Sequence, residues 1–408
     1  MSHDPTVPTA RRDPNAGARD AATPSLDLDL FGRRALADPL PHMAAVRAAG
    51  PAVWLPRNRL WAIGRYQPVY AALRSPEVFA SGRGVAANTP VNALSRSTVL
   101  CSDADDHQRR RRVLLGSLAP KSLTTVQATL EQTAEELVTR LVRKGDFDGV
   151  RDFASTLPVD VVADLVGLRV PAGRLLAWGG ATFDALGPYN RGALGSAARA
   201  GQMLLFARRL RARDVTEGGW AASVFRAADE GTLTRHEART MIIDFVAPSL
   251  DTTILASAHM LWLLGVTPGL WQRVRDDPAV IPSVVAESVR LSSPVRAFTR
   301  YVTRDTEVGG VPVPAGSRAL LLYAAANRDP DRFPDPDRVD LDRRSGDQLG
   351  WGTGPHTCVG MHLAKLEMAA LLRAMVPRVA SIRVGRPTPL RNNVLQGMSA
   401  LPAAFTPA

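Results

Sequence analysis

The chain has 408 residues, of which 45% are apolar and 22% charged, with 31 prolines and 32 glycines. This globular composition can bury a large core and excludes disordered, collagen-like and repeat proteins. The two cysteines, Cys101 and Cys358, are too few for a disulfide-stapled scaffold and predict free thiols and a cytoplasmic location. No apolar run is as long as a membrane span and the first residues lack a secretory signal, so no membrane association is expected.

The net charge of +11 comes almost entirely from arginine, because the chain contains only three lysines. One basic run, Arg109–Arg112, is typical of nucleic-acid-binding proteins, of solvated helix faces and of docking sites for acidic proteins. No aromatic residues alternate with these arginines and no recognition motif accompanies them, so nucleic-acid binding is not expected. The solvated face and the docking site both remain open.

Residues 1–25 contain almost no large apolar side chain and are expected to form a disordered tail. Residues 26–408 show no linker, repeat or change of composition, which predicts a single domain. Hydrophobic spacing and turn residues predict several local elements within it. In chain order they are a hairpin at 52–66, a helix at 67–75, an amphipathic helix at 123–143, and strands at 311–313 and 319–323. The fold class is therefore mainly α with minor β.

The strongest helical pattern runs from about Thr234 to Leu264. Thr234 and Glu237 have the spacing of a capping box at its beginning, while Gly265 and Pro268 follow its end. Its residues are apolar nearly all round, which predicts a helix buried through the centre of the domain.

A proline and two polar residues interrupt this helix. Pro248 removes one backbone hydrogen bond and should kink the helix, and Asp251 and Thr252 follow in the same buried stretch. A kinked, polar interruption in a core helix is typical of a functional site.

The most informative stretch is Trp351–Gly360, with the sequence WGTGPHTCVG, followed by a helical pattern. Glycines and a proline predict a tight loop that presents Cys358 at the N-terminal end of a helix, where a thiolate is favoured. Gly360 would let a flat ligand approach the backbone closely, so the thiolate is suited to hold an iron axially. A lone cysteine is more often a small buried hydrophobe, and a cysteine nucleophile also stays open, whereas no zinc-ligand spacing is present.

The whole stretch resembles the haem-binding loop of the cytochrome P450 monooxygenases, with Trp351 in place of the usual phenylalanine, and the resemblance extends over residues 26–408. It implies a cytochrome P450 fold with haem between a long central distal helix and a proximal cysteine loop, and Cys358 as the axial iron ligand. It also implies roles for further residues. The implied haem contacts are His107, Arg111, Arg300, His356, Gly352 and Gly360, and the implied salt-bridged triad is Glu287, Arg290 and Arg338.

Asp251 and Thr252 resemble the acid–alcohol pair that delivers protons to dioxygen in this family. The sequence departs from the family just before this pair, because Pro248 and Ser249 stand where small residues form the oxygen-binding groove. This departure leaves open how efficiently electron consumption is coupled to product formation.

Several stretches resemble the bacterial enzymes of this family that oxidise para-substituted benzoates, often by O-demethylation. In that subgroup arginine and serine side chains hold the substrate carboxylate, and the corresponding loop here offers Ser95, Arg96 and Ser97. The positions of the distal helix that are polar in that subgroup are occupied here by Ile243, Asp244 and Ala247, so half of this anchor is missing. Asp244 would repel an acid if it faced the pocket. The other implied pocket residues, each of which fits plain core equally well, are Leu100, Phe183, Leu186, Ala247, Val295 and Phe298.

The resemblance therefore implies a monomeric haem-thiolate monooxygenase that inserts one atom of O2 into a small aromatic or apolar substrate by hydroxylation or oxidative O-demethylation, with a para-substituted aromatic acid as one candidate. It implies haem b as cofactor and electrons from NAD(P)H through a ferredoxin reductase and a ferredoxin. Two alternatives stay open: a tailoring oxidase of natural-product biosynthesis, and a haem-thiolate binding or sensing protein without turnover.

Overall fold

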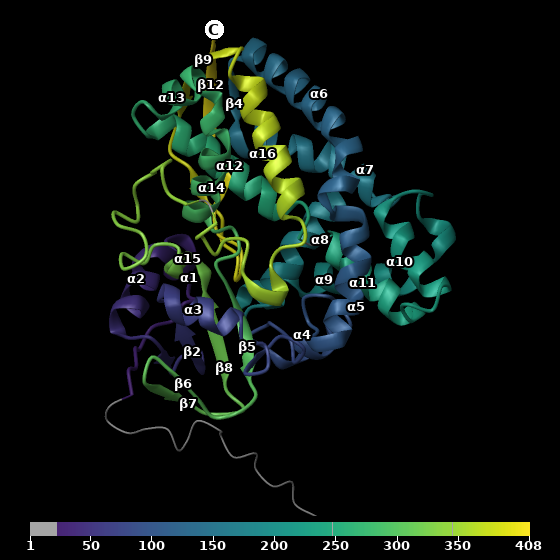
Figure 1. The fold of residues 1–408 in the computed structure, drawn as a ribbon, viewed down its shortest axis with the longest axis vertical. Helices are drawn as coiled ribbons and strands as arrows, with labels where there is room; N and C mark the ends of the chain where they lie inside the picture. Colours follow the sequence, from purple (N-terminus) through teal and green to yellow (C-terminus); the bar gives the residue numbers. More distant parts are fainter. Residues whose placement is uncertain (1–22, 247, 345) are drawn as a thin grey trace, which may run out of the picture.

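A helical part and a smaller strand-rich part lie side by side in the computed structural model, which describes residues 23–246, 248–344 and 346–408 (Figure 1). The α-helices are α1 (Arg33–Ala37), α2 (Pro39–Ala49), α3 (Tyr66–Leu73), α4 (Thr89–Leu94), α5 (Ala104–Leu118), α6 (Pro120–Lys144), α7 (Ala163–Val166), α8 (Ala172–Ala185), α9 (Arg191–Arg209), α10 (Trp220–Asp229), α11 (Arg235–Val246), α12 (Asp251–Val266), α13 (Leu270–Asp276), α14 (Ile281–Ser292), α15 (Tyr323–Ala326) and α16 (Met361–Met375). The strands are β1 (Val53–Leu55), β2 (Leu60–Ile63), β3 (Phe79–Ala80), β4 (Asp146–Asp148), β5 (Ala297–Val302), β6 (Thr306–Val308), β7 (Val311–Val313), β8 (Arg318–Leu322), β9 (Val379–Val384), β10 (Thr388–Pro389), β11 (Met398–Ala400) and β12 (Pro402–Pro407). The mainly helical prediction is confirmed.

The main sheet has five strands in the order β1-β2-β8-β5-β3. β1 and β2 form the predicted hairpin, and β2 pairs with β8 in parallel. Alternate residues of a strand point to opposite faces, and the buried residues of β2 and β8 follow this rule. Trp61 and Leu321 belong to one apolar cluster, whereas Leu60 and Leu320 belong to another. The sheet therefore separates two small cores and holds β5 firmly between β8 and β3.

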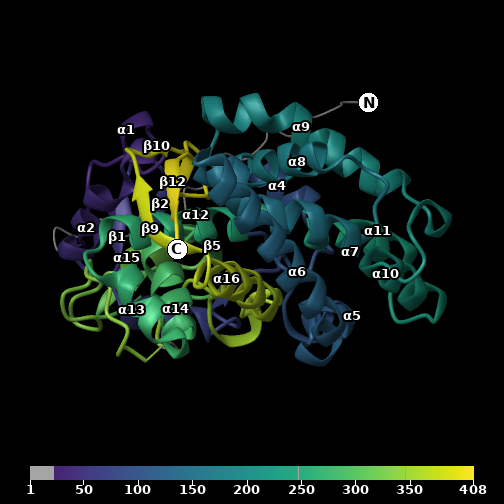
Figure 2. The same cartoon turned by 90° about the horizontal axis from the view of Figure 1, so that it is seen from above.

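The largest apolar cluster lies in the helical part and includes buried residues of α6, α12, α14 and α16. Seen from above, α12 lies among the other helices near the middle of the molecule, with α6 and α16 beside each other (Figure 2). By length and hydropathy alone, the run Arg235–Val266 is sufficient to cross a membrane, but 65% of its most apolar window is buried inside the molecule. A buried core helix can have the same length and hydropathy.

The predicted disordered tail, residues 1–25, includes two residues that belong to the fold. Ser25 pairs with Trp54 of β1, and the Trp54 amide donates a hydrogen bond to the Pro24 carbonyl. These two residues, which were predicted to be disordered, are therefore part of the fold because they extend the sheet edge. Residues 1–22 lie outside the described residues.

The predicted long helix is two helices, α11 and α12. The capping box is confirmed, since the Glu237 amide donates to Thr234 Oγ1 at 3.1 Å and the Thr234 amide donates to Glu237 Oε2 at 2.8 Å. The prediction of a continuous, kinked helix is wrong. Pro248 has no backbone N–H to continue the ladder, and α12 begins only at Asp251.

The buried ion-pair triad has a different third member from the one expected. Arg290 forms a bidentate pair with Glu287 at 2.7 and 2.8 Å, and it donates to the backbone carbonyl of Arg338. The Arg338 side chain is exposed, so the assignment of this residue to the triad is wrong. Arg343 is the third member of the triad instead: its Nε lies 3.6 Å from Glu287 Oε2, and its side chain is only 12% exposed. A contact between loop residues and a distant helix has no local sequence signal.

We expect Arg343→Met to lower the free energy of unfolding by about 1–2 kcal/mol, because it removes one of two cations from a buried carboxylate that keeps the other. Arg338→Met is the matched control and should change stability by less than about 0.5 kcal/mol. Urea unfolding of both variants measures the difference. Equal losses in the two variants would contradict the placement of Arg343.

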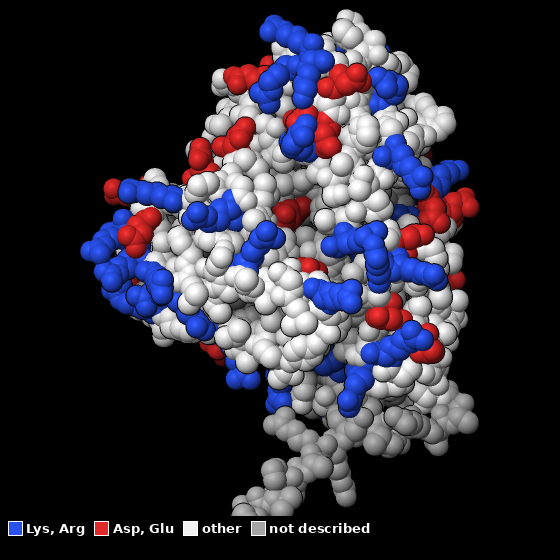
Figure 3. Space-filling model, turned by 180° about the vertical axis from the view of Figure 1, so that it is seen from behind, with Lys and Arg blue, Asp and Glu red and all other residues white. Residues whose placement is uncertain are grey.

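On the face shown in Figure 3, basic side chains are spread out and do not form one continuous stripe. Figure 3 shows blue side chains scattered across one face with red ones among them, and a denser blue group at its left edge. Part of this charge is neutralised locally, as in the ion pairs Arg235–Asp229 and Arg383–Asp146.

Candidate active site

The cysteine loop presents Cys358 at the beginning of α16. Gly352 and Gly354 adopt φ angles of 67° and 72°, a conformation that favours glycine. The Cys358 amide donates to the Trp351 carbonyl at 2.8 Å and closes the loop. Because the helix begins at Met361, its first amides lie beside the sulfur.

Cys358 is exposed just before the beginning of α16. Desolvation by the surrounding protein raises the pKa of its thiol, and hydrogen bonds from the Gly360 and Met361 amides and the charge of Arg111 oppose the rise. These groups stabilise a thiolate. A Cβ added to Gly360 would lie 4.0 Å from the sulfur, so the glycine leaves the space beside Cys358 open.

Four basic side chains from three parts of the chain gather next to Cys358. His107 and Arg111 lie one turn apart on α5, Arg300 is buried on β5, and His356 precedes the cysteine in the loop. The rings of His107 and His356 are 4.2 Å apart between centroids. The structure thus brings together the residues to which the resemblance assigns the haem.

Burial disfavours the protonated form of both imidazoles. Burial lowers the pKa of His107 to about 4, and the charges of His356 and Arg111 add to this effect. Burial also lowers the pKa of His356, and the Asp103 carboxylate, whose Oδ1 lies 3.7 Å from His356 Nε2, opposes the change. Asp103 was missed by the sequence reasoning; it is the N-cap residue of α5 and accepts hydrogen bonds from the Ser81 and Gly82 amides.

This donor set fits a haem. The Nε2 atoms of His107 and His356 are buried and have no hydrogen-bond partner among the described residues. Two guanidinium groups, of Arg111 and Arg300, lie in the same cluster and complement the carboxylates of two propionates. The Cys358 thiolate would hold the iron of such a haem.

The acid–alcohol pair lies at the break between α11 and α12. Thr252 Oγ1 donates to the Pro248 carbonyl at 2.9 Å, which fixes the hydroxyl against the end of the break. Asp251 Oδ2 is buried without a hydrogen-bond partner among the described residues. Burial raises the pKa of Asp251 to about 7, so this carboxyl both takes up and releases protons near neutral pH.

Five of the expected pocket residues belong to one small apolar cluster. Leu255 of α12 lies in this cluster one turn after Asp251, and neither it nor Cys101 was predicted as a pocket residue. Residues this far apart in sequence give no periodic signal that would group them. The cluster contains the expected Leu100, Phe183, Leu186, Val295 and Phe298, together with Val85, Ala86, Val91, Cys101, Leu255, Leu390, Val394 and Leu395.

The expected carboxylate anchor is only partly present near this cluster. Ser95 and Ser97 are half-buried, and Ser97 has a φ of 80°. Arg96 is exposed. Ala247 lies outside the described residues. These residues therefore do not form the arginine-and-serine grip that an aromatic acid would need.

The arginine run is divided among three environments. Arg109 and Arg110 both bind Glu237 of α11, with N–O distances of 2.7 and 2.8 Å, and Arg110 is buried. Arg111 faces Cys358, and Arg112 is the one residue of the four that is exposed. Of the docking site that the run left open, Arg109 is therefore not a free member, because Glu237 holds its guanidinium.

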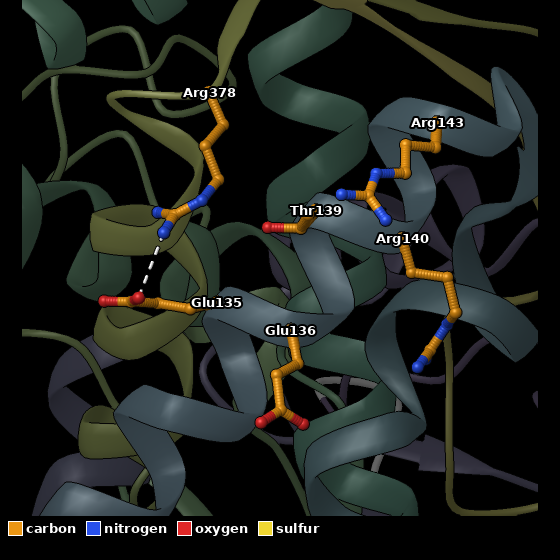
Figure 4. A pocket seen from close by; sticks show the side chains of 6 residues that line it. All are labelled: Glu135, Glu136, Thr139, Arg140, Arg143 and Arg378. Carbon is orange, nitrogen blue, oxygen red and sulfur yellow. Dashed lines mark hydrogen bonds and ion pairs between the residues drawn. The ribbon is translucent and has the colours of Figure 1, made fainter.

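A separate surface hollow of about 430 Å³ lies along the C-terminal half of α6. Figure 4 shows its charged lining, in which Arg378 reaches Glu135 at 3.0 Å. Glu136, Arg140 and Arg143 line the rest, together with Thr139. None of the residues that line it belongs to the Cys358 group or to the apolar cluster.

Comparison with known proteins agrees with this geometry. The family model described as Cytochrome P450 matches residues 219–380. The chain is 34% identical over 396 residues to Cytochrome p450 CYP199A2 of Rhodopseudomonas palustris, covering 95% of this chain and 96% of that protein. It is 30% identical over 358 residues to mycinamicin IV hydroxylase/epoxidase of Micromonospora griseorubida, covering 85% and 89% of the two chains.

The fold also matches a solved structure, the CYP116B5 heme domain of Acinetobacter radioresistens, with a TM-score of 0.83 and 25% identity over 93% of this chain and 97% of that one. The family uses haem, O2 and reducing equivalents from redox partners. The chain, with its basic cluster, helix break and cysteine loop, belongs to the cytochrome P450 family and is an oxidoreductase.

Proposed function

We propose that the protein inserts one atom of O2 into a small aromatic or apolar molecule, by hydroxylation or by oxidative O-demethylation. The observation that carries this proposal is the presence of an apolar cluster beside the Asp251–Thr252 pair, since Leu255 of the cluster lies one helical turn from that pair. The other oxygen atom leaves as water, which requires two electrons and two protons.

The residues of this chain have distinct tasks in the proposed reaction. His107, Arg111, Arg300 and His356 would hold the propionates, and Cys358 would hold the iron. Bound haem supplies the oxygen-activating chemistry. Asp251 takes a proton from solvent, and Thr252 holds a proton-bearing hydroxyl at its Oγ1 atom. The apolar cluster orients the substrate and excludes water.

Turnover with isotopically labelled dioxygen tests the proposal. A hydroxylated product should carry one labelled atom per molecule. In O-demethylation the inserted atom leaves with formaldehyde and the phenol keeps the oxygen of the substrate, so formaldehyde release is the readout there. An unlabelled hydroxylated product, or the absence of both hydroxylation and formaldehyde release, would overturn the proposal. A panel of small aromatic compounds is suitable. The sensing alternative predicts substrate-induced spectral change without any product.

We further propose electron supply by a ferredoxin and a ferredoxin reductase, with the protein acting as a cytoplasmic monomer. Exposed cations near Cys358 suit an acidic partner. Arg112 on α5 and Lys365 on α16 are both exposed, and the α5 and α16 helices are the two that place Arg111 and Cys358 together.

We expect Arg112→Glu to slow ferredoxin-driven reduction several-fold at low salt, because complementary charge mainly raises the encounter rate. The difference should shrink as salt shortens the screening length, about 10 Å at 0.1 M. Stopped-flow reduction measures the rate, and reduction by dithionite should be unchanged.

Arg304→Glu is the matched control, since Arg304 is exposed beside β6 and away from α5 and α16. Equal, salt-independent reduction rates for the wild type and both variants would contradict docking at Arg112 and would indicate that this face of α5 is only solvated.

A further inference from the structure

Asp244 of α11 binds the backbone of the loop that supplies part of the apolar cluster. Its Oδ2 atom accepts a hydrogen bond from the Val99 amide at 2.9 Å, and the Leu100 amide also contributes. α11 and the loop that follows α4 are thereby joined across 145 residues of sequence.

The Asp244 carboxyl lies at the edge of the apolar cluster. Leu100 and Cys101, next along the loop from Val99, belong to that cluster. Asp244 also acts electrostatically on Cys101, whose thiol pKa is raised mainly by burial. Ser95 and Thr98 complete the loop contacts to Cys101.

No cation neutralises Asp244 directly. Among the described residues, no Lys, Arg or His side chain forms an ion pair with it. The cation that acts on it is Arg110 of α5, and that guanidinium is bound to Glu237 at 2.8 Å. A second carboxylate brought into the cluster would therefore meet an acidic side chain whose charge is not cancelled.

We propose that Asp244 is a specificity-determining residue that makes this site select neutral aromatic molecules over aromatic acids. The loop amides that could otherwise bind an anion are already occupied by Asp244. A neutral end group that donates a hydrogen bond, such as a carboxamide, complements the same side chain. This inference rests on the proposed function, because it takes the apolar cluster as the substrate site.

The charge of Asp244 should depend on pH near neutrality. Burial raises the pKa of Asp244 to about 7, while the Val99 and Leu100 amides and Arg110 oppose the rise. The titratable and charged groups acting on it are Cys101 from the loop and Arg110 from α5. Above pH 7 the carboxylate is ionised and repels an acid, and below pH 7 it takes up a proton and the repulsion weakens.

The experiment compares the binding of 4-methoxybenzoate and 4-methoxybenzamide to the holoenzyme at pH 8 and pH 6. Calorimetry and haem spin-state titration report binding independently of turnover. We expect the wild type to bind the benzamide about tenfold or more tightly than the benzoate at pH 8, with a smaller ratio at pH 6.

Asp244→Asn should raise benzoate affinity by about tenfold at pH 8 and flatten its pH dependence, because asparagine keeps an acceptor for the Val99 amide but has no charge. Glu136→Gln, an equal change of net charge at the α6 hollow, should behave like the wild type. A merely structural role for Asp244 would leave the benzoate-to-benzamide ratio unchanged.

Benzoate binding at least as tight as benzamide binding in the wild type, or unchanged selectivity in Asp244→Asn, would overturn the inference. Failure of the proposed function gives a different result. In that case turnover yields neither a labelled hydroxylated product from labelled dioxygen nor formaldehyde from the methoxy group, whichever ligand binds more tightly.

Discussion

Replacing Cys358 with histidine is expected to abolish the absorption band that is characteristic of the carbon monoxide complex of reduced thiolate-ligated haem. The sulfur lies at the start of α16, where the Gly360 and Met361 amides and Arg111 stabilise a thiolate. Imidazole is a neutral ligand and lacks the electron donation that favours O–O cleavage, so product formation should be lost with the band. Absorption spectroscopy of the reduced protein under carbon monoxide provides the measurement.

Cys101→Ser is the control for the second thiol of the chain. Cys101 is buried in the apolar cluster and contacts Ser95 and Thr98, not the basic group around His107. The serine variant should keep the thiolate band. A band that persists in Cys358→His, or disappears in Cys101→Ser, would contradict the assignment of the axial ligand.

The second large effect is expected at Thr252. In Thr252→Ala, product formation should fall by about 10²–10⁴-fold while NAD(P)H consumption continues and hydrogen peroxide accumulates, because a positioned proton donor is lost. The hydroxyl is fixed by its 2.9 Å hydrogen bond to the Pro248 carbonyl. Product and peroxide, each measured per NAD(P)H consumed, give the coupling.

Thr252→Ser keeps the hydroxyl and is the matched control, which should retain most of the coupling. Ser249 lies within the break and offers a second hydroxyl. Unchanged coupling in Thr252→Ala would contradict the role of Thr252, and loss of coupling in a Ser249→Ala variant would then transfer that role to Ser249.

The elements that the sequence predicted well are those fixed by neighbouring residues. The capping box of α11 depends on two residues three apart, and the β1–β2 hairpin depends on a short apolar segment between turns. The sequence predicted only a kink before α12, whereas the structure has two separate helices there. A proline predicts the loss of one hydrogen bond, but whether the helix resumes at once depends on the packing of both segments against other elements.

The residues of the candidate site also divide into those that a local motif predicts and those that depend on tertiary contacts. Cys358 was recognised because its loop is a continuous motif, whereas the third partner of Glu287 comes from a loop 56 residues away and was assigned to Arg338 instead of Arg343. The direction of each side chain in the Arg109–Arg112 run also depends on a distant residue, Glu237. Contacts of this kind are set by tertiary packing, which periodicity does not encode.

The binding of Arg290 to several carbonyls has a consequence for local stability. Between α15 and the short turn at Gly354, the described chain has neither helix nor strand, yet Arg290 binds the carbonyls of Asn327, Pro336 and Arg338. Because this one buried guanidinium holds several points of an irregular segment, the hydrogen bonds there should break together rather than one at a time. Amide hydrogens from Asn327 to Leu349 should therefore exchange with solvent as one cooperative unit, and the opening of that unit would release the chain that leads directly into the cysteine loop.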